Sequence, residues 1–156
     1  MDWKILTHPD PNLRSRSEEI DVREVKTAEF QKFADDFAAF MVASDGVGLA
    51  APQIGMKKRI IAVDEGETVG VYVNPEFVKK STAMQENEEG CLSIPGVYGI
   101  VERPKRVRVK AIDRHGRKIT FDVSGFRAAV FQHEVDHLDG VLFIDKMTKI
   151  TRGSAK

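Results

Sequence analysis

The chain has a single cysteine, Cys91, no net charge and no long hydrophobic run. With one cysteine no intramolecular disulfide can form, which is the usual situation in a reducing compartment. Lys and Arg total 24 and Asp and Glu total 24, so the basic excess typical of nucleic-acid-binding proteins is missing. No stretch approaches the roughly 18 apolar residues of a transmembrane helix. These absences argue against a disulfide-stabilised secreted domain, a nucleic-acid partner and a membrane partner.

Targeting signals are also missing from the N-terminal residues. Met1–Leu6 contain no basic segment followed by an apolar run, so they read as neither a signal peptide nor a transit peptide. We therefore expect a cytoplasmic location, or an organelle interior if a targeting segment has been removed. Basic side chains do cluster within 105–110 and 114–118, but their alternating positions favour solvated strand faces over a phosphate-binding patch.

What is present is the composition of one globular domain. The 156 residues are 42% hydrophobic and 31% charged, without repeats or flexible linkers, which predicts a single domain over 1–156. A stripe of aromatic residues from Phe30 to Met41, spaced three and four apart, predicts a helix over 28–43 that begins at an N-cap, Thr27. We expect an extended surface segment over 7–17.

The middle of the chain has the pattern of β-strands and the last third that of a second helix. Runs rich in Val and Ile predict strands, and Ser124 and Gly140 are suited to begin and end a helix over 125–139. After Asp145 we expect a frayed tail. One early helix, central strands and one late helix predict an α+β fold. The predicted strands are 59–63, 69–73, 106–112 and 118–123, with a hairpin turn at 114–117.

The sharpest local signal is His133-Glu134-Val135-Asp136-His137. On a helix both imidazoles lie on one face and can reach one ion, and the glutamate between them can act as a base on water, as in zinc hydrolases. The alternative is a pair of histidines at a solvated helix end. Phe126, Ala129 and Val130 fall on the same face, so we expect that face to point inward and the histidines to need a buried partner.

Cys91 is the candidate third ligand of a catalytic metal, which usually has three protein ligands and an open position. It lies in a stretch of small residues, 89–96, that we interpret as a loop between strands. A lone cysteine can also be a small buried hydrophobe or a nucleophile. Spacing alone does not bring Cys91 to the helix.

The third notable segment is 46–55, which is rich in Gly and Ala. Its glycines allow close backbone approach to a ligand, and its alternative interpretation is a tight turn after the first helix. A phosphate-binding loop is disfavoured because no Gly-Lys-Ser/Thr follows. Gln53 is the one polar side chain in this apolar segment, which suggests a positioned hydrogen bond.

Together and in this order, three segments resemble the motifs of the peptide deformylase family, and the resemblance covers nearly the whole chain. They are Gly46–Gln53, Glu89–Ser93 and Gln132–His137. The resemblance implies an α+β fold with antiparallel sheets around the metal-binding helix. It implies removal of the formyl group from formyl-methionine at the N-terminus of new polypeptides. It also implies one divalent ion, with Fe²⁺ the physiological metal and Ni²⁺, Co²⁺ or Zn²⁺ able to replace it.

The resemblance also implies roles for individual residues. Cys91, His133 and His137 would bind the ion, Glu134 would be the base, and Gln53 and the Leu92 N–H would stabilise the oxyanion. Glu89 and Asp136 are candidates to orient Gln53, a ligand or a neighbouring cation, and the alternative for either is a capping or salt-bridge carboxylate. Tyr98 would lie near the substrate in a role that the motifs leave open. The substrate would contact apolar side chains and glycine backbone: Val47, Phe126, Ala129, Val130, Gly48, Gly90 and Gly96.

Three alternatives stay open at this point. A general metallopeptidase would usually have His or Glu as its third ligand. A silent relative that only binds metal or peptide N-termini would not need Glu134. A thiol sensor would normally want a second cysteine. The ribosome is a further partner to consider, but the short chain after Ile144 argues against docking through a C-terminal helix.

Overall fold

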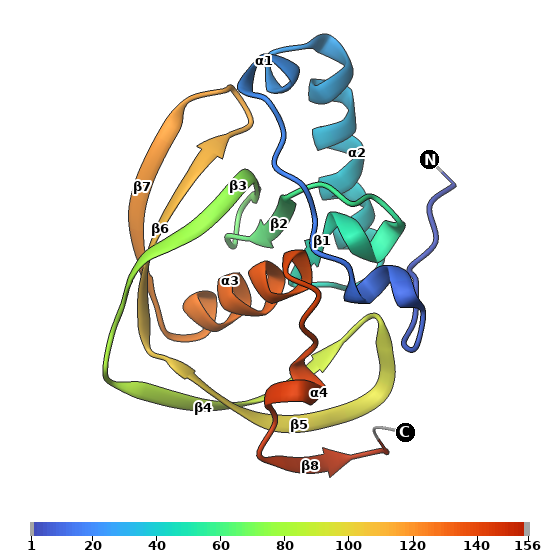
Figure 1. Cartoon of the computed structure of the whole chain (residues 1–156), viewed down its shortest axis with the longest axis vertical. Helices are drawn as coiled ribbons and strands as arrows, with labels where there is room; N and C mark the ends of the chain where they lie inside the picture. The colour runs from blue at the N-terminus through green and yellow to red at the C-terminus, as the bar shows by residue number, and fades with distance from the viewer. Residues whose placement is uncertain (1, 155–156) are drawn as a thin grey trace.

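Residues 2–154 are described by a computed structural model. Two antiparallel sheets enclose the late helix (Figure 1). The helices are α1 (Val22–Val25), α2 (Ala28–Ala43), α3 (Gly125–Leu138) and α4 (Phe143–Lys146), with 3₁₀ turns at Pro11–Arg14 and Ala51–Ile54. The strands are β1 (Gly48–Ala50), β2 (Ile60–Asp64), β3 (Val69–Lys80), β4 (Met84–Cys91), β5 (Ile94–Pro104), β6 (Arg106–Asp113), β7 (Lys118–Ser124) and β8 (Lys149–Arg152).

Helix α2 forms as its sequence predicts. The Thr27 hydroxyl accepts a hydrogen bond from the Phe30 backbone N–H at 3.1 Å, which satisfies one of the free donors at the helix start. Phe30, Phe37 and Met41 are buried at helical spacing. The ring of Trp3 packs edge-on against Phe37, so the N-terminal segment covers this helix. The aromatic stripe is therefore core packing.

The larger sheet has the order β1-β2-β3-β6-β7. All four predicted strands are present in it, and the predicted turn at 114–117 closes the β6–β7 hairpin through the Asp113 N–H and the Arg117 carbonyl. Alternate residues of β6, among them Val107 and Val109, are buried and pack against the α3 side of the core. Strand β3 runs on to Lys80, further than its Val-rich part indicates.

The smaller sheet has the order β4-β5-β8. One strand of each sheet corrects an interpretation made from the sequence. The stretch 89–96 is not a loop, because Cys91 is the last residue of β4 and pairs with Ile94 across a tight turn. Likewise, Gly48–Ala50 is not a turn but the edge strand β1. Both strands lack an alternating apolar pattern, since β4 is a largely polar edge strand and β1 is buried throughout its three residues.

The C-terminal segment is ordered through residue 154, in contrast to the frayed tail that its composition suggests. Strand β8 pairs with β5 between Tyr98 and Ile100, and the Thr148 N–H donates to the Ile100 carbonyl. In Figure 1 this strand lies beside β5 at the bottom of the view. The two last residues of the predicted tail lie outside the described part of the chain.

Helix α3 is the central element, with the larger sheet on one side and the β4–β5 hairpin on the other (Figure 1). Its residues from Ala128 to Leu138 are mostly buried, and Gly140 follows its end at φ +74°, as expected for a C′ glycine. Ser124 is the N-cap residue, as expected, but its side chain makes no capping hydrogen bond. The α+β prediction is confirmed.

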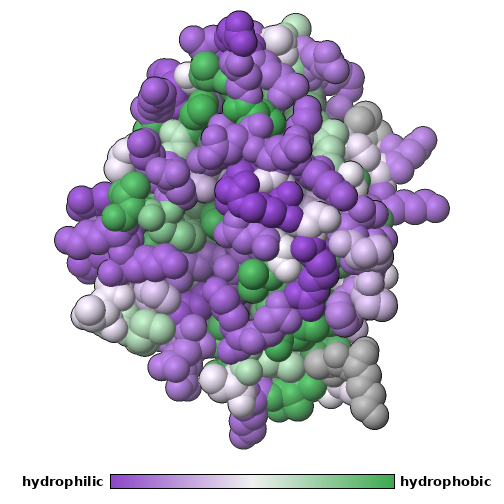
Figure 2. Space-filling model, in the orientation of Figure 1, coloured by the Kyte–Doolittle hydropathy of each residue, from purple (hydrophilic) through white to green (hydrophobic). Residues whose placement is uncertain are grey.

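The outer surface is mostly polar on the face viewed in Figure 1. Hydrophobic side chains appear there only in small separated groups (Figure 2). Among residues 2–154, no helix is both long and apolar enough to cross a membrane.

Candidate metal centre

Three side chains with metal-binding atoms meet at the buried face of α3. His133 and His137 lie one helical turn apart, with ring centroids separated by 5.1 Å, and Cys91 approaches from the end of β4. Cys91 Sγ lies 3.3 Å from His137 Nε2, and one ligand atom from each residue lies within 4.8 Å of the others. A tetrahedral ion at about 2.3 Å from sulfur and 2.0–2.1 Å from nitrogen needs ligand atoms roughly 3.3–3.6 Å apart. The Cys91–His137 pair has this spacing, and all three ligand atoms are close enough together for the side chains to share one ion.

A buried carboxylate orients the first of these histidines. Glu89 Oε1 lies 2.8 Å from His133 Nδ1, which leaves Nε2 directed away from the carboxylate and free for a metal. Burial alone would raise the pKa of Glu89, but hydrogen bonds from Arg103 and His133 lower it to about 2. Glu89 is therefore ionised and orients the His133 ring, and it is also the salt-bridge carboxylate of the alternative interpretation, because it pairs with Arg103.

Arg103 of β5 links Glu89 of β4 to Asp136 of helix α3. Its guanidinium donates to Glu89 Oε1 at 2.9 Å and to Asp136 Oδ2 at 2.9 Å, and only 2% of the side chain is exposed. Lys146 of α4 contacts the other oxygen of Asp136 at 3.1 Å. No sequence pattern indicates a role for Arg103, because a lone Arg in a β-strand usually faces solvent. Its burial depends on two carboxylates from other elements.

Glu134 lies next to the ligand cluster and is 4% exposed. Its Oε1 has no hydrogen-bond partner among the described residues, which is unusual for a buried carboxylate. Burial raises the pKa of Glu134 to about 7, and a bound cation would oppose that shift. Gly48 of β1 makes room for this side chain, since a Cβ there would lie 2.5 Å from Glu134 Oε2. The carboxylate is thus held, unpaired, beside the ligand atoms.

The electrostatics of the cluster also favour a cation. Burial lowers the pKa of His137 well below its ordinary value, which keeps this imidazole neutral as a ligand must be. Burial would also lower the pKa of His133, but its contacts with Cys91 and Glu89 raise it instead. That shift reflects the surplus of acidic groups around His133, which a divalent ion would balance. His137 Nδ1 has no partner among the described residues.

Gln53 makes the positioned hydrogen bonds that its sequence context suggested. Its Oε1 accepts from the Ala50 N–H at 2.9 Å, and its Nε2 donates to Ser93 Oγ at 3.0 Å. The same Nε2 lies 3.6 Å from Cys91 Sγ. These bonds fix the side-chain amide with its donor end toward the cluster, where it could meet developing negative charge.

A cleft of about 470 Å³ opens onto the cluster. Its walls come from β1, β4, the start of β5 and the face of α3 that carries Glu134 and His133. Every residue predicted to be catalytic or substrate-binding lines it, with two of the predicted metal ligands: Val47, Gly48, Gln53, Gly90, Cys91, Leu92, Phe126, Ala129, Val130, His133 and Glu134. Gly96 and Tyr98 line it as well, together with residues that the motifs did not indicate: Asp45, Asn87, Glu88 and Pro95.

One expectation about this wall was wrong. Phe126 does not face the interior with Ala129 and Val130 but is 62% exposed, and Val47 opposite is 47% exposed. Phe126 belongs to the first turn of α3, before the helix passes between the sheets. The two side chains therefore form an apolar rim at the mouth of the cleft.

An unpaired buried glutamate beside a thiol and two imidazoles, on this α+β scaffold, defines a metal-dependent hydrolase. The model of the family described as Polypeptide deformylase matches residues 3–153. The chain belongs to the peptide deformylase family, whose members are metal-dependent amide hydrolases that remove the N-formyl group from newly made polypeptides.

Individual relatives agree with this assignment. A peptide deformylase of Fusobacterium nucleatum is 44% identical over 153 residues, which cover 97% of this chain and 87% of the relative. The crystal structure of the peptide deformylase of Thermotoga maritima has a TM-score of 0.88 at 36% identity, covering 94% of this chain and 97% of that one. A Met-Ala-Ser-bound peptide deformylase of Acinetobacter baumannii has a TM-score of 0.88 at 33% identity, covering 94% of this chain and 99% of that one.

Proposed function

We propose that this chain acts as one catalytic domain in which Cys91, His133 and His137 hold a single divalent ion. The observation that carries the proposal is the set of three ligand atoms within 4.8 Å of one another beside the unpaired Glu134. We assign Fe²⁺ as the physiological ion, with Ni²⁺, Co²⁺ or Zn²⁺ able to occupy the same ligands. Such an ion supplies Lewis acidity to a water and to the formyl oxygen.

The residues around the ion carry the proton and hold the charge. Glu134 takes a proton from the attacking water and returns it to the leaving amine, a role suited to a buried carboxylate whose pKa is raised to about 7. The Gln53 amide and the Leu92 backbone N–H donate to the oxygen that becomes negative as the formyl carbon turns tetrahedral. Because hydrogen bonds to Ala50 and Ser93 fix the Gln53 amide, little reorganisation is needed at that step.

The cleft suits a peptide with methionine at its N-terminus. Val47, Phe126, Ala129 and Val130 form an apolar pocket for the methionine side chain. Strands β1 and β4 stand at the edges of their two sheets and face the same cleft, so Gly48 and Gly90 offer backbone groups to an extended peptide between them. The Acinetobacter baumannii relative bound to Met-Ala-Ser supports a peptide in this family's cleft.

The substrates that we propose are formyl-methionyl peptides emerging from the ribosome in the cytoplasm or an organelle interior. The described C-terminal segment forms β8 on the smaller sheet instead of a projecting helix.

The reaction is tested by incubating the Fe²⁺- or Ni²⁺-loaded protein, without oxygen, with formyl-Met-Ala-Ser. We expect formate and intact Met-Ala-Ser in equal amounts, because the cluster lies beside the pocket for the first residue only. Mass spectrometry identifies the peptide product, and unformylated Met-Ala-Ser serves as the control. Cleavage of either peptide at its Met-Ala bond would instead indicate a general metallopeptidase, and absence of formate would reject deformylation.

A further inference from the structure

The strand β8 lies directly behind one wall of the cleft. It pairs with β5 in a register that places Arg152 opposite Tyr98, and Tyr98 lines the cleft. The next residue, Gly153, has φ +79° and leaves no room for a Cβ against the carbonyl of Gly96, which also lines the cleft. The C-terminal strand is therefore in close contact with the wall that these β5 residues form.

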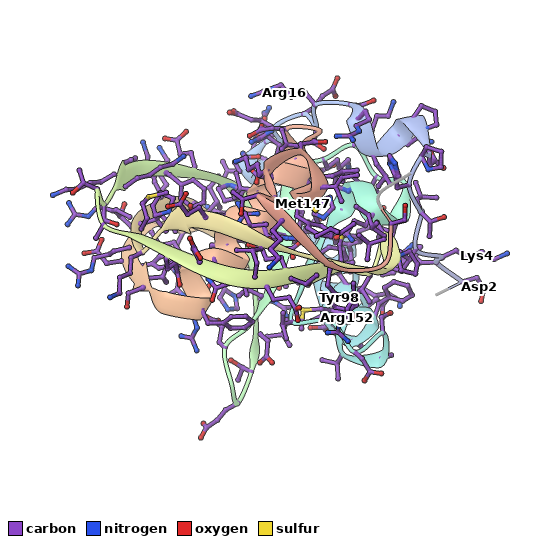
Figure 3. All side chains as sticks on the ribbon, turned by 90° about the horizontal axis from the view of Figure 1, so that it is seen from below. Asp2, Lys4, Arg16, Tyr98, Met147 and Arg152 are labelled. Carbon is purple, nitrogen blue, oxygen red and sulfur yellow. The ribbon has the colours of Figure 1, made fainter. Side chains whose placement is uncertain are left out.

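Arg152 makes two contacts with residues of the cleft. Its guanidinium carbon lies 4.0 Å from the centroid of the Tyr98 ring, a cation–π geometry, and Figure 3 shows the two side chains together. Its Nη2 lies 3.2 Å from Glu88 Oε1. Thr151 donates to the other oxygen of Glu88 at 2.6 Å. One short strand thus holds two cleft-lining side chains, from β4 and from β5.

The Tyr98 ring connects these contacts to the metal ligand Cys91. A Cβ on Gly90 would lie 2.5 Å from Cε1 of the ring, so the ring rests against the backbone of the residue that precedes Cys91. Gly90 belongs to the edge of β4 along which we propose that the peptide lies. A tyrosine that left this position would open the wall at that point.

We propose that Arg152 is a positioning residue for the peptide part of the substrate. Arg152 holds the Tyr98 ring against Gly90. The cleft wall beyond the methionine pocket therefore already has its binding conformation before the peptide binds. Without Arg152, the half-exposed ring would be free to adopt other rotamers, and peptide binding would have to order it. The inference rests on the proposed course of the peptide along β4, and it assigns Arg152 no part in the chemical step.

The test compares Arg152→Ala with Arg108→Ala, a matched control in which an exposed arginine loses a carboxylate partner on the other sheet. With formyl-Met-Ala-Ser amide we expect the Arg152 variant to raise KM about 2- to 5-fold, the range of an exposed cation–π contact. Its kcat should stay within about twofold, because Arg152 contacts none of the proposed catalytic residues. The control should change neither constant, and formyl-methionine amide, which lacks the later residues, should not distinguish the variants.

Two further variants separate positioning from a direct charge contact. Arg152→Lys keeps the charge without the planar guanidinium, and we expect it to recover only part of the wild-type KM. Tyr98→Ala should match Arg152→Ala, and the double variant should be no worse than either, since both remove the same placed ring. An additive double variant, a fall in kcat alone, or an effect confined to peptides with a free carboxylate would overturn the proposal.

Binding supplies a readout that does not need turnover. Calorimetry with metal-loaded protein and Met-Ala-Ser amide should show, for Arg152→Ala, the same weakening of about 2- to 5-fold as the kinetic measurement. If the wild-type protein binds this peptide but releases no formate, the proposed reaction is rejected. The role of Arg152 is then decided by the peptide affinities of wild type and Arg152→Ala. Equal peptide affinity of wild type and Arg152→Ala, or no peptide binding by either, would overturn the positioning role.

Discussion

Replacing Glu134 by alanine should lower kcat by roughly 10²- to 10⁴-fold, the usual contribution of a positioned general base. Glu134 is the buried carboxylate without a partner in the described structure, and it is not among the three clustered ligand residues. The variant should therefore keep its metal while it loses turnover. Formate release at saturating formyl-Met-Ala-Ser gives kcat, and elemental analysis of the same sample gives the metal content.

Glu134→Gln is the matched control for shape, because it keeps the contact with Gly48 and removes only the base. We expect it to be nearly as inactive as the alanine variant. Turnover at the wild-type rate in either variant would remove Glu134 from the proposed mechanism. Loss of the metal in both would show that Glu134 helps to hold the ion.

Replacing Cys91 by alanine should weaken metal binding by more than about 100-fold, since even outer partners of metal ligands contribute 10- to 100-fold. The two histidines that remain leave the site one ligand short of a catalytic metal centre. The change removes one sulfur from a half-buried position at the end of β4, so the fold should persist. Competition with a chelator of known affinity measures the loss, and circular dichroism checks the fold.

Ser93→Ala is the control for this variant, because it removes a neighbouring polar group that contacts Gln53 and is not one of the clustered ligand residues. It should bind metal as the wild type does. Wild-type metal occupancy in Cys91→Ala would show that the thiol is not a ligand. The site would then need a third ligand from elsewhere.

Local sequence patterns account well for the helices and for the larger sheet. The aromatic stripe of α2 and the alternating apolar residues of β6 report burial on one side of their own element, and the continuous apolar run of β2 reports burial on both sides. The spacing of His133 and His137 likewise places both rings on one face without any knowledge of the rest of the fold. These features can be predicted from the sequence because the residues that determine them lie within one helical turn or one strand.

The parts that sequence reasoning missed depend on distant partners. Strand β4 is polar because it is an edge strand, so its pairing with β5 leaves no hydrophobic alternation to read. Arg103 is buried only because Glu89 and Asp136 approach it from β4 and α3. Strand β8 likewise owes its order to its pairing with β5 and to no pattern of its own.

The approach of Cys91 to helix α3 also depends on residues that are distant in the sequence. Its 3.3 Å contact with His137 joins residues 46 positions apart, and no spacing rule predicts it. The resemblance to a family suggested that contact where the residues alone left it open. The three-dimensional fold brings the thiol and both imidazoles together, and that arrangement carries the proposed function.

The most direct test of that arrangement is a metal titration of the apoprotein. Protein freed of metal by a chelator without oxygen should release no formate from formyl-Met-Ala-Ser. Added Fe²⁺ or Ni²⁺ should restore formate release in proportion to the metal, and the rate should level off at about one ion per chain, as one set of three ligands requires. Formate release by the metal-free protein at the loaded rate, or a rate that still climbs beyond one ion per chain, would contradict a single metal centre at Cys91, His133 and His137.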